Sequence, residues 1–340
     1  MGTQDCSHFD QVRMQNRRII RNLMRQAAQI TKAELAEESG LSFPTVSALI
    51  GDLLASGEVI RLPESATRGG RPAELFALSP VFQTAVCAYI EDHNLYIRVY
   101  DVFGQVLHDA RSLLTSGHSS PLLLENLLRI REQFPSLSVL CLGIPGVIEN
   151  GRLTYLPDYP DMQDLPLQQM LETALSVPVH LENDVNVFVS AERDQWPDLV
   201  HIFLGANGPG AGILVRGQLI RGVCGYAGEL EFLPFEHLGV PVTFCEKLRR
   251  IKADMAGSDG RTLFLQCLAR AIVSIICIIN PPDVALSGFG LAGSDIADLQ
   301  GELERIIPAA RCPALHIVDQ VDDLYQSGLL KIAMDDWKER

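Results

Sequence analysis

Closely spaced cysteine pairs and membrane-length apolar runs are both absent from this sequence, and each absence excludes a class of protein. The eight cysteines are scattered with no CxxC motif, which excludes a disulfide framework of the kind found in small secreted proteins. Cys267 and Cys277 lie in apolar runs, a pattern typical of buried free thiols in a reducing compartment. The longest apolar stretch, Ala271–Ile279, is too short to span a bilayer, and the polar N-terminus has no apolar signal region. We therefore expect a cytoplasmic protein with no membrane contact.

Basic residues are also scarce, with 28 Lys and Arg against 42 Asp and Glu and a net charge of −14. This balance argues against nucleic-acid binding only if it is uniform along the chain. Residues 1–80 contain nine basic and nine acidic residues, whereas residues 81–340 contain 19 basic and 33 acidic residues. Residues 11–33 contain no acid and six basic residues: Arg13, Arg17, Arg18, Arg21, Arg25 and Lys32. Such a local basic face can bind phosphate, because screening beyond about 10 Å mutes the acidic remainder.

Residues 16–78 follow the order helix, helix, turn, helix and hairpin, which is typical of a winged helix-turn-helix. Asn16 is expected to cap a first helix whose apolar stripe is formed by Ile19, Ile20, Leu23, Met24 and Ala27. Thr31 opens a short second helix, with Glu34 three residues on as its capping-box partner. Ser42 caps the third helix, and Pro44 falls in its first turn, where the missing N–H costs nothing.

The third helix is the expected recognition helix. Its buried stripe is predicted to contain Val46, Leu49, Ile50, Leu53 and Leu54. The start of the helix then faces outward, where a recognition helix places side chains against base edges in the major groove. The predicted DNA contacts there are Ser42, Phe43, Thr45 and Ser47. A three-helix packing module for protein contacts remains an open alternative.

Four arginines on the first helix, Arg13, Arg17, Arg21 and Arg25, follow i, i+4 spacing on one face. This row is either a solvated helix surface or a set of phosphate contacts. In the context of a DNA reader, we expect Arg17 and Arg21 to contact DNA.

A basic hairpin follows the third helix at the position of a wing. Two predicted strands, 58–62 and 73–78, flank a Gly-rich and Pro-ended loop that carries Arg68 and Arg71. Guanidinium groups on such a loop can lie in a narrow minor groove. A flexible linker that is basic by chance is the alternative.

From residue 84 onward, predicted strands alternate with predicted helices, which implies layered α/β halves with ligands at strand C-termini. The expected strands are 84–90, 95–100, 138–143, 179–182, 199–204, 211–215 and 283–287, and the expected helices are 121–133, 165–175 and 263–279. A chain of 340 residues has room for about two or three domains. We predict a DNA-binding domain at 1–80 and a body at 81–340, with lobes at about 81–182 and 183–340.

Four short motifs in the body narrow the prediction from a general α/β fold to a particular family. They are Gly143–Gly146, Glu182–Asn186, Gly208–Gly212 and Tyr226–Glu229. In this order and spacing they resemble the ROK family, which combines sugar kinases with sugar-responsive repressors. Residues 16–78 resemble the DNA-binding extension of the repressor members. The resemblance implies an N-terminal winged helix-turn-helix, α with a small β wing, followed by a two-lobed α/β body of the actin/hexokinase-like (ribonuclease H-like) type.

The resemblance also implies effector-binding residues. Asn183 and Asp184 would hold sugar hydroxyls, and Asp184 would be the general base in a kinase, here a vestigial one. Glu229 would accept further hydroxyls, and Gly146 would lie beside them. Each acid also has a structural explanation, since Asp184 could cap the helix that begins near residue 185 and Glu229 could be an ordinary acid at a hairpin end.

Departures from the family pattern argue against nucleotide binding. Tyr89 stands where kinases have an Asp, and Asp92 with His93 replaces their Gly-Thr. A carboxylate beside a triphosphate opposes binding by its charge, and the loss of Gly prevents close backbone approach. The second phosphate loop survives as Gly208–Gly212, although a tight hairpin turn explains it equally well. We therefore predict no enzymatic activity.

The family's zinc site is also expected to be lost. Phe232 stands where the family has a His, and the segment that should carry three cysteines offers only Cys245. Even with the nearby His237, two ligands are too few for a tetrahedral site. We expect no metal and no cofactor. Phe232 should make the effector pocket less polar, and Glu246 is a candidate to reach it.

These features together predict a DNA-binding transcription regulator, a repressor of the ROK type that senses a sugar or sugar derivative. Its expected partners are a double-stranded DNA operator, a small sugar-like effector and further copies of the same chain in a homodimer or tetramer. Two alternatives remain open: an active sugar kinase with a DNA-binding extension, and a regulator whose body only oligomerises and binds no effector.

Overall fold

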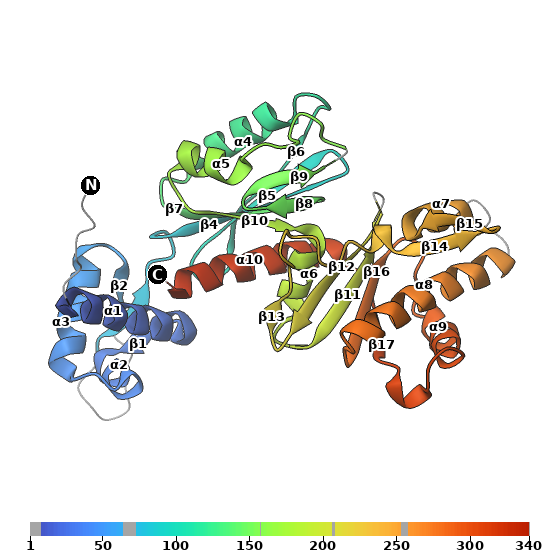
Figure 1. Ribbon diagram of the computed structural model, residues 1–340. Coiled ribbons are helices and arrows are strands. Elements are labelled where there is room, and N and C mark those ends of the chain that lie inside the picture. The colour runs from blue at the N-terminus through green and yellow to red at the C-terminus, as the bar shows by residue number, and fades with distance from the viewer. Residues whose placement is uncertain (1–7, 64–72, 157, 206–207, 253–257, 340) are drawn as a thin grey trace.

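The computed structural model of the chain describes residues 8–63, 73–156, 158–205, 208–252 and 258–339. It contains a small N-terminal domain and two larger α/β lobes, joined by the C-terminal helix α10 (Figure 1). The expected fold class, a winged helix-turn-helix followed by a two-lobed α/β body, is confirmed.

The N-terminal domain consists of three helices and a three-stranded antiparallel sheet in the order β1-β3-β2. Its elements are α1 His8–Ala27, β1 Ile30–Thr31, α2 Lys32–Ser39, α3 Phe43–Ala55, β2 Val59–Leu62 and β3 Leu75–Leu78. Thr31 and Glu34 form the expected capping box of α2. At the start of α3, the Ser42 hydroxyl accepts a hydrogen bond from the Thr45 N–H. Arg68 and Arg71 lie outside the described residues.

Helix α1 begins eight residues earlier than the sequence suggested. It starts at His8, so Asn16 lies inside the helix and does not cap it. Residues 8–15 contain neither Pro nor Gly, and nothing in them interrupts the intrahelical hydrogen bonds.

Lobe 1 contains a five-stranded sheet in the order β10-β7-β4-β5-β6, with parallel pairing among the first three strands. Its elements are β4 Thr84–Glu91, β5 Asn94–Tyr100, β6 Val106–Leu113, α4 Ser119–Gln133, β7 Leu137–Ile144, β8 Val147–Glu149, β9 Arg152–Tyr155, α5 Leu167–Leu175 and β10 Val179–Asn183. Alternate residues of β4 pack on opposite faces of the sheet, because side chains alternate along a strand. Val86 and Ala88 join the core that includes residues of α4 and α5, whereas Cys87 and Tyr89 pack with residues of α6 and α10.

Lobe 2 contains a second five-stranded sheet in the order β13-β12-β11-β16-β17. Its elements are β11 Leu199–Leu204, β12 Pro209–Val215, β13 Gln218–Leu219, η1 Leu230–Phe232, β14 Pro234–His237, β15 Val240–Thr243, α7 Phe244–Lys252, α8 Ser258–Ile278, β16 Asp283–Gly288, α9 Asp295–Glu304, η2 Ala309–Arg311 and β17 Ala314–Val318. Within α8, the stretch Asp259–Ile278 is long and apolar enough to cross a membrane, but half of it is buried. Its buried residues contribute much of the lobe 2 core.

The expectation of a buried thiol at Cys277 is wrong. Cys267 is buried in the lobe 2 core, but Cys277 is exposed near the end of α8 beside Ile278, which is also exposed. The apolar run in the sequence therefore continues beyond the part of the helix that the sheet covers. All seven cysteines in the described part of the chain are free.

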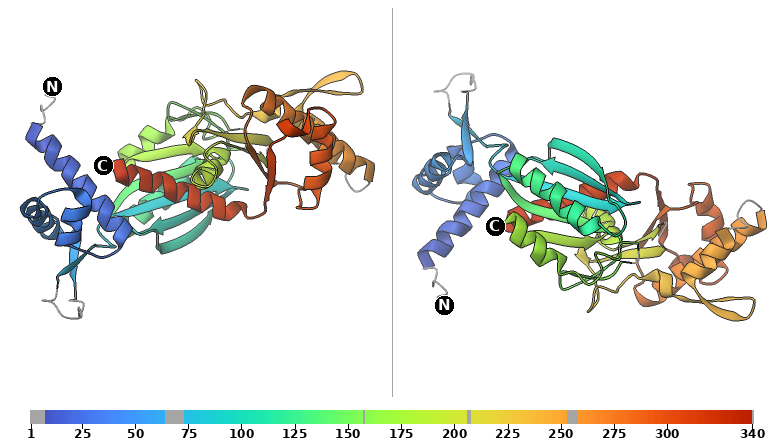
Figure 2. Two further views of the ribbon diagram at one scale, coloured as in Figure 1. Left: turned by 90° about the horizontal axis from the view of Figure 1, so that it is seen from below. Right: turned by 90° about the horizontal axis from the view of Figure 1, so that it is seen from above.

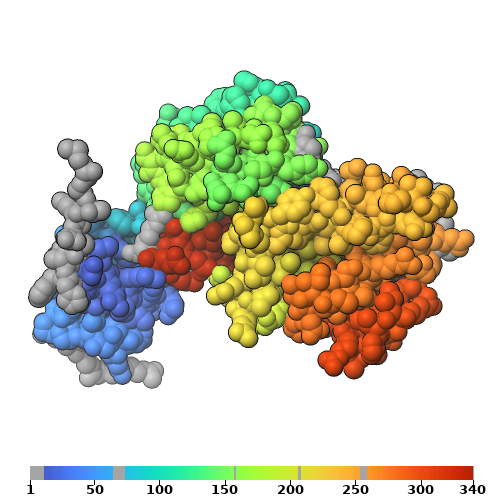
Figure 3. Space-filling view, in the orientation of Figure 1, coloured from blue at the N-terminus to red at the C-terminus, as the bar shows by residue number. Residues whose placement is uncertain are grey.

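Two helices lie between the lobes: α6 Asp184–Glu192 and α10 Val321–Glu339. They pack on each other and on the same face of the lobe 1 sheet, while α6 also contacts β11 and β12 of lobe 2. Helix α10 runs from the junction of the lobes back to the N-terminal domain, where its C-terminal end lies close to α1 (Figure 2). In the space-filling view, its red surface is visible between that domain and the lobes (Figure 3).

Contacts with α10 and with the β5–β6 turn attach the N-terminal domain to the body. The indole Nε1 of Trp337 donates a 2.9 Å hydrogen bond to the Ser138 hydroxyl, and the Arg25 guanidinium lies 5.7 Å from the Trp337 ring centroid. In addition, Val102 and Phe103 from the β5–β6 turn pack into the core of the N-terminal domain. The N-terminal domain is therefore held by lobe 1 and α10 together.

Candidate ligand cleft and DNA interface

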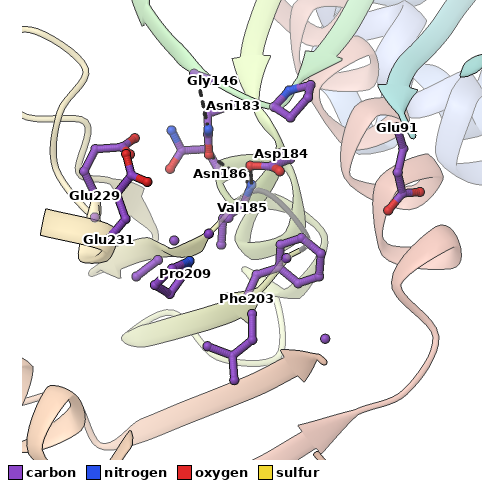
Figure 4. A pocket seen from close by; sticks show the side chains of 18 of the residues that line it. Glu91, Gly146, Asn183, Asp184, Val185, Asn186, Phe203, Pro209, Glu229 and Glu231 are labelled. Atoms are coloured by element: carbon purple, nitrogen blue, oxygen red, sulfur yellow. Dashed lines mark hydrogen bonds between the residues drawn. The ribbon is translucent and has the colours of Figure 1, made fainter. Parts of the chain in front are cut away.

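A cleft of about 340 Å³ lies between the two lobes, at the C-terminal ends of strands from both sheets. Figure 4 shows acidic and amide side chains from different elements around this space. Acidic residues that line it include Glu91, Asp184, Glu229 and Glu231. Its volume falls at the low end of the range of about 300–1,000 Å³ that is typical of small-molecule sites.

The junction of β10 and α6 positions Asn183 and Asp184. Asn183 is the N-cap of α6: its Oδ1 accepts from the Val185 N–H at 3.0 Å, and its Nδ2 donates to the Gly146 carbonyl at 3.0 Å. Asp184 also accepts from the Val185 N–H, at 2.8 Å. Both residues therefore serve the helix terminus and line the cleft. Burial raises the pKa of Asp184 to about 6, although hydrogen bonds to the backbone and Asn183 act in the opposite direction.

A glycine contact positions Glu229. Gly228 has a φ of +93°, and a Cβ there would lie 1.8 Å from the Ala211 carbonyl oxygen. The close approach lets the Ala211 N–H donate to the Gly228 carbonyl at 2.8 Å, which pins the following turn to β12. Burial raises the pKa of Glu229 to about 7, and the negative charges of Asp184 and Glu231 add to the shift.

Glu231 lies in the cleft wall, beside Glu229 in Figure 4. Its Oε1 is buried and has no hydrogen-bond partner among the described residues. Burial raises its pKa, while a hydrogen bond with Tyr155 and the charge of Arg249 act in the opposite direction. Sequence reasoning did not identify this residue, and its only signal was a second acid within the Tyr226–Glu231 segment.

Aromatic rings pack behind the β4–β5 turn, where the family's first phosphate hairpin was expected to be lost. Asp92 and His93 form a tight two-residue turn with φ values of 45° and 59°, between paired strands β4 and β5. Behind the turn, Tyr89 stacks between Tyr96 and Tyr325, with centroid distances of 4.6 and 4.1 Å. The turn lines the cleft through Glu91 and Asp92, so a phosphate at this position would meet two acidic side chains.

Glu91 lines the same edge of the cleft. Burial raises its pKa to about 7, and the charges of Asp322, Asp92 and Asp184 add to the shift. A carboxyl group whose ionisation is opposed by burial and by neighbouring acids indicates a site that does not favour anions.

The second glycine loop is tightly packed. Gly205 N–H donates to the Gly208 carbonyl at 3.2 Å, and a Cβ on Gly212 would lie 2.5 Å from the Val185 carbonyl oxygen. Gly212 therefore permits β12 to approach α6. The glycines have a packing explanation that is independent of any phosphate. Residues 206–207 lie outside the described residues.

Two residues expected to shape the pocket lie elsewhere. Glu246 is exposed, and its Oε2 accepts from the Thr243 N–H at 2.9 Å in the cap of α7. Phe232 is half-exposed and stacks on Tyr226 at 5.6 Å, outside the cleft lining. Both expectations are corrected: Phe232 ends η1, Glu246 lies in the first turn of α7, and neither residue lines the cleft. Within the described ranges, no group of three or more His, Cys, Asp or Glu side chains is arranged to hold a metal.

The start of α3 forms the candidate DNA-reading surface. Ser42 and Phe43 are exposed, whereas Thr45 and Ser47 are partly exposed. The Ser42 and Thr45 hydroxyls lie 2.8 Å apart. Lys32, which the sequence analysis did not single out as a contact, brings its ammonium within 3.4 Å of the Ser47 hydroxyl. The four predicted base-contacting residues therefore occur on one accessible surface beside a cation.

The arginine row on α1 is largely engaged within the protein. The Arg21 guanidinium binds the buried Glu58 carboxylate through two hydrogen bonds of 2.7 and 2.9 Å. Arg25 lies against Trp337, and Arg13 pairs with Asp52. Arg17 is partly buried, and its Nε has no hydrogen-bond partner among the described residues. Arg21 therefore ties α1 to Glu58, the residue that precedes β2. The expectation that Arg21 contacts DNA is wrong.

The sequence profile described as "ROK family" matches residues 94–247, and the one described as "Winged helix-turn-helix DNA-binding" matches residues 15–58. A xylose repressor of Caldicellulosiruptor bescii is 25% identical over 216 residues, which are 59% of this chain and 54% of the relative. The chain therefore spans about half the length of such relatives.

Two solved structures share the fold. A ROK family transcriptional regulator, a homologue of the E. coli Mlc protein, has a TM-score of 0.73 at 18% identity and covers 96% of this chain and 98% of that one. The ROK hexokinase of Thermus thermophilus has a TM-score of 0.59 at 20% identity and covers 75% of this chain and 100% of that one.

The fold and the site define the class of this protein: a winged helix-turn-helix joined to a sugar-kinase-like α/β body. Within that class, the chain is similar to the ROK family, whose profile matches residues 94–247.

Proposed function

We propose that this protein is a DNA-binding transcription regulator of the repressor type, whose interlobe cleft binds a sugar or sugar derivative. Residues 1–80 would bind an operator, and residues 81–340 would bind the effector and assemble copies of the chain. The observation that carries the proposal is the combination of an accessible α3 surface with an interlobe cleft lined by acids, including Asp92 of the β4–β5 turn. A protein that acts on DNA in this way would work in the cytoplasm.

Helix α10 supplies a physical route from the cleft to the DNA-binding domain. Tyr325 lines the cleft, and three turns further along the same helix Trp337 contacts Arg25 of α1 and Ser138 of β7. The Arg18 guanidinium also donates to the Lys338 carbonyl. A ligand that closes the lobes would move α10 against lobe 1 and so reposition α1.

The regulatory step is a shift between two populations. A ligand changes DNA affinity only by the difference between its affinities for the two arrangements of the lobes. In a homodimer or tetramer, the two recognition helices must match half-sites about 34 Å apart, or a multiple of that distance. A small rotation of each N-terminal domain is therefore enough to change operator binding.

The test begins by selecting bound sequences from a pool of random double-stranded DNA with the full chain. Binding to the selected DNA should weaken steeply with salt, because phosphate contacts release counterions. Neutral sugars, amino sugars and sugar phosphates are then titrated against the complex. Failure to select any sequence would overturn the DNA-binding function, and DNA binding that no compound in the panel changes would overturn the sensor function.

A sugar kinase is the second candidate, because Asp184 lies at the cleft with its pKa raised to about 6. A carboxylate near that value can act as a general base. The stacked tyrosines at the nucleotide hairpin oppose this activity. We expect no sugar-dependent ATP consumption, and turnover that is lost in Asp184→Asn would establish the kinase instead.

A further inference from the structure

We propose that the ligand of the interlobe cleft carries an amine, so that the preferred class is an amino sugar or a similar amine-bearing polyol. This proposal rests on the proposed function of the cleft as an effector site, and it specifies the charge of the effector.

The charged groups around the cleft are strongly unbalanced. Five acids line it: Glu91, Asp92, Asp184, Glu229 and Glu231. Lys252 of α7 is the one basic residue among the described residues that line it. Its ammonium lies 3.9 Å from the Phe289 ring centroid, so an aromatic face already partly satisfies this charge. Two further groups act from neighbouring elements: Arg249 of α7 reduces the pKa of Glu231, and Asp322 of α10 adds negative charge near Glu91.

The inner acids oppose one another's ionisation. The charges of Asp184 and Glu231 both raise the pKa of Glu229, in addition to the effect of burial. Hydroxyl groups of a neutral sugar can donate hydrogen bonds to these carboxylates but cannot offset their mutual repulsion. An ammonium group does both, since it donates three hydrogen bonds and carries the opposite charge.

Glu231 offers a specific acceptor for this group. Its Oε1 is buried in the cleft wall and lacks a hydrogen-bond partner among the described residues. Glu229 lies beside it on the same turn (Figure 4). The carboxyl group also has a hydrogen bond with Tyr155, so it is only partly satisfied in the empty cleft, and a ligand N–H would supply the remaining hydrogen bond.

Two other classes of charged ligand fit less well. A divalent metal needs converging ligands, and the described residues contain no group of three or more His, Cys, Asp or Glu in such an arrangement. A phosphate would add negative charge to a cleft lined by five acids. A cleft of about 340 Å³ suits an organic ligand of monosaccharide size.

The first experiment compares matched ligands by titration calorimetry with the full-length protein at pH 7.5. D-Glucosamine, D-galactosamine and D-mannosamine are each paired with the neutral parent hexose, and with the N-acetyl form, which keeps the nitrogen but removes its charge. We expect at least one amine to bind at least about tenfold more tightly than both neutral partners, since a charge-assisted hydrogen bond contributes more than a neutral one. The 6-phosphates should bind most weakly.

A pair of variants then locates the amine. Glu231→Gln should reduce the affinity for the amine about tenfold and change the affinity for the neutral parent by less than about twofold. Glu246→Gln makes the same chemical change at an exposed position outside the cleft and should leave both affinities unchanged. A thermal melt of each variant checks that it is folded.

The outcomes separate this inference from the proposed function. If neutral hexoses bind and alter DNA binding while no amine binds more tightly, the amine preference is wrong and the sensor function remains. If Glu231→Gln weakens the amine and the neutral sugar equally, Glu231 does not read the charge and the proposal is wrong. If no sugar of any charge binds, both the amine preference and the sensor function are overturned.

Discussion

At the scale of single residues, the same side chain can be required for structure or for ligand binding, and its neighbours decide which. Asn183 is the clearest case in this protein. Its amide caps α6 through Val185 and also binds the Gly146 carbonyl, so its hydrogen-bonding groups are largely used within the chain. Glu229 and Glu231 differ, because they face the cleft without compensating cations in contact.

Replacing Glu229 should stabilise the empty protein at alkaline pH. The folded chain raises the pKa of Glu229 from 4.5 to about 7, so between these pH values the folded state binds more protons than the unfolded state. The free energy of unfolding therefore falls as pH rises through this window and stays lower above it. Glu229→Gln removes this loss, and we expect it to be more stable than the parent by about 1–2 kcal/mol at pH 8, since one pKa unit is worth about 1.4 kcal/mol and solvent screens a partly exposed group.

Urea denaturation of both proteins at pH 4 and pH 8 measures this difference. At pH 4 the carboxyl is protonated in both states, and the two proteins should have nearly equal stability apart from the effect of the substitution itself. A parent that is as stable as Glu229→Gln at pH 8 would contradict the proposed repulsion in the cleft.

A second prediction at this scale concerns Arg21. The side chain of its partner Glu58 is only 7% exposed, so removal of the arginine leaves a buried carboxylate unpaired. Arg21→Ala should therefore lower the free energy of unfolding by about 2–4 kcal/mol. Arg129→Ala, which breaks an exposed i, i+4 pair with Glu125, should cost less than about 0.5 kcal/mol.

Thermal denaturation distinguishes this role from direct DNA contact. If Arg21→Ala keeps the parent melting temperature and loses only DNA affinity, the guanidinium acts on phosphate and the interpretation as a structural pair is wrong.

At the scale of elements, the sequence predicted best those features whose determinants are close together in the chain. The capping box joins Thr31 and Glu34, which are three positions apart, and it was found where expected. The arginine row on α1 was harder to interpret, since its most important partner, Glu58, is 37 residues away from Arg21. A periodic pattern shows that these arginines share a helix face but not what covers that face.

The candidate site, too, could be predicted only in part from the sequence. Asn183, Asp184 and Glu229 were identified, and all three line the cleft. Glu231 was missed and Glu246 was misplaced, because the short turn that follows Gly228 decides which acid faces inward. Tyr325 was not predicted at all, because it reaches the cleft from the C-terminal helix, far from the other motifs in sequence.

Helix α10 yields a prediction about coupling. Arg25→Met keeps the length of the side chain but removes the charge that lies over the Trp337 ring. We expect the variant to bind ligand with an affinity within about twofold of the parent, since Arg25 is remote from the cleft. The ligand-induced change in DNA affinity should fall severalfold, because coupling energies of 1–3 kcal/mol are typical and part of this one passes through the contact.

The measurement is a DNA-binding titration with and without saturating ligand. Arg129→Met makes the same substitution on the exposed face of α4 and should preserve the full response. An Arg25→Met protein whose response equals that of the parent would show that α10 does not transmit the signal through this contact.

At the scale of the whole molecule, a body with most of the acidic charge carries the small winged helix-turn-helix domain at one end (Figure 3). Its net charge of −14 opposes close approach of the body to DNA, so only the N-terminal domains of an assembled protein should touch the duplex. Two such domains can then bind together only if their half-sites lie on the same side of the DNA.

This geometry predicts a periodic dependence on half-site spacing. Because one turn of B-DNA contains about 10.5 base pairs, inserting five base pairs between the half-sites turns them to opposite sides and should reduce affinity about as much as deleting one half-site. Inserting ten or eleven base pairs returns the two half-sites to the same side of the DNA and should recover part of the affinity. The rest is lost because the body is strained when it spans the longer distance. Gel-shift titrations on the parent site, the two insertions and a single half-site measure this directly. Equal affinity at all spacings would mean that each copy binds DNA independently, and the rotation of linked N-terminal domains could then not control the operator.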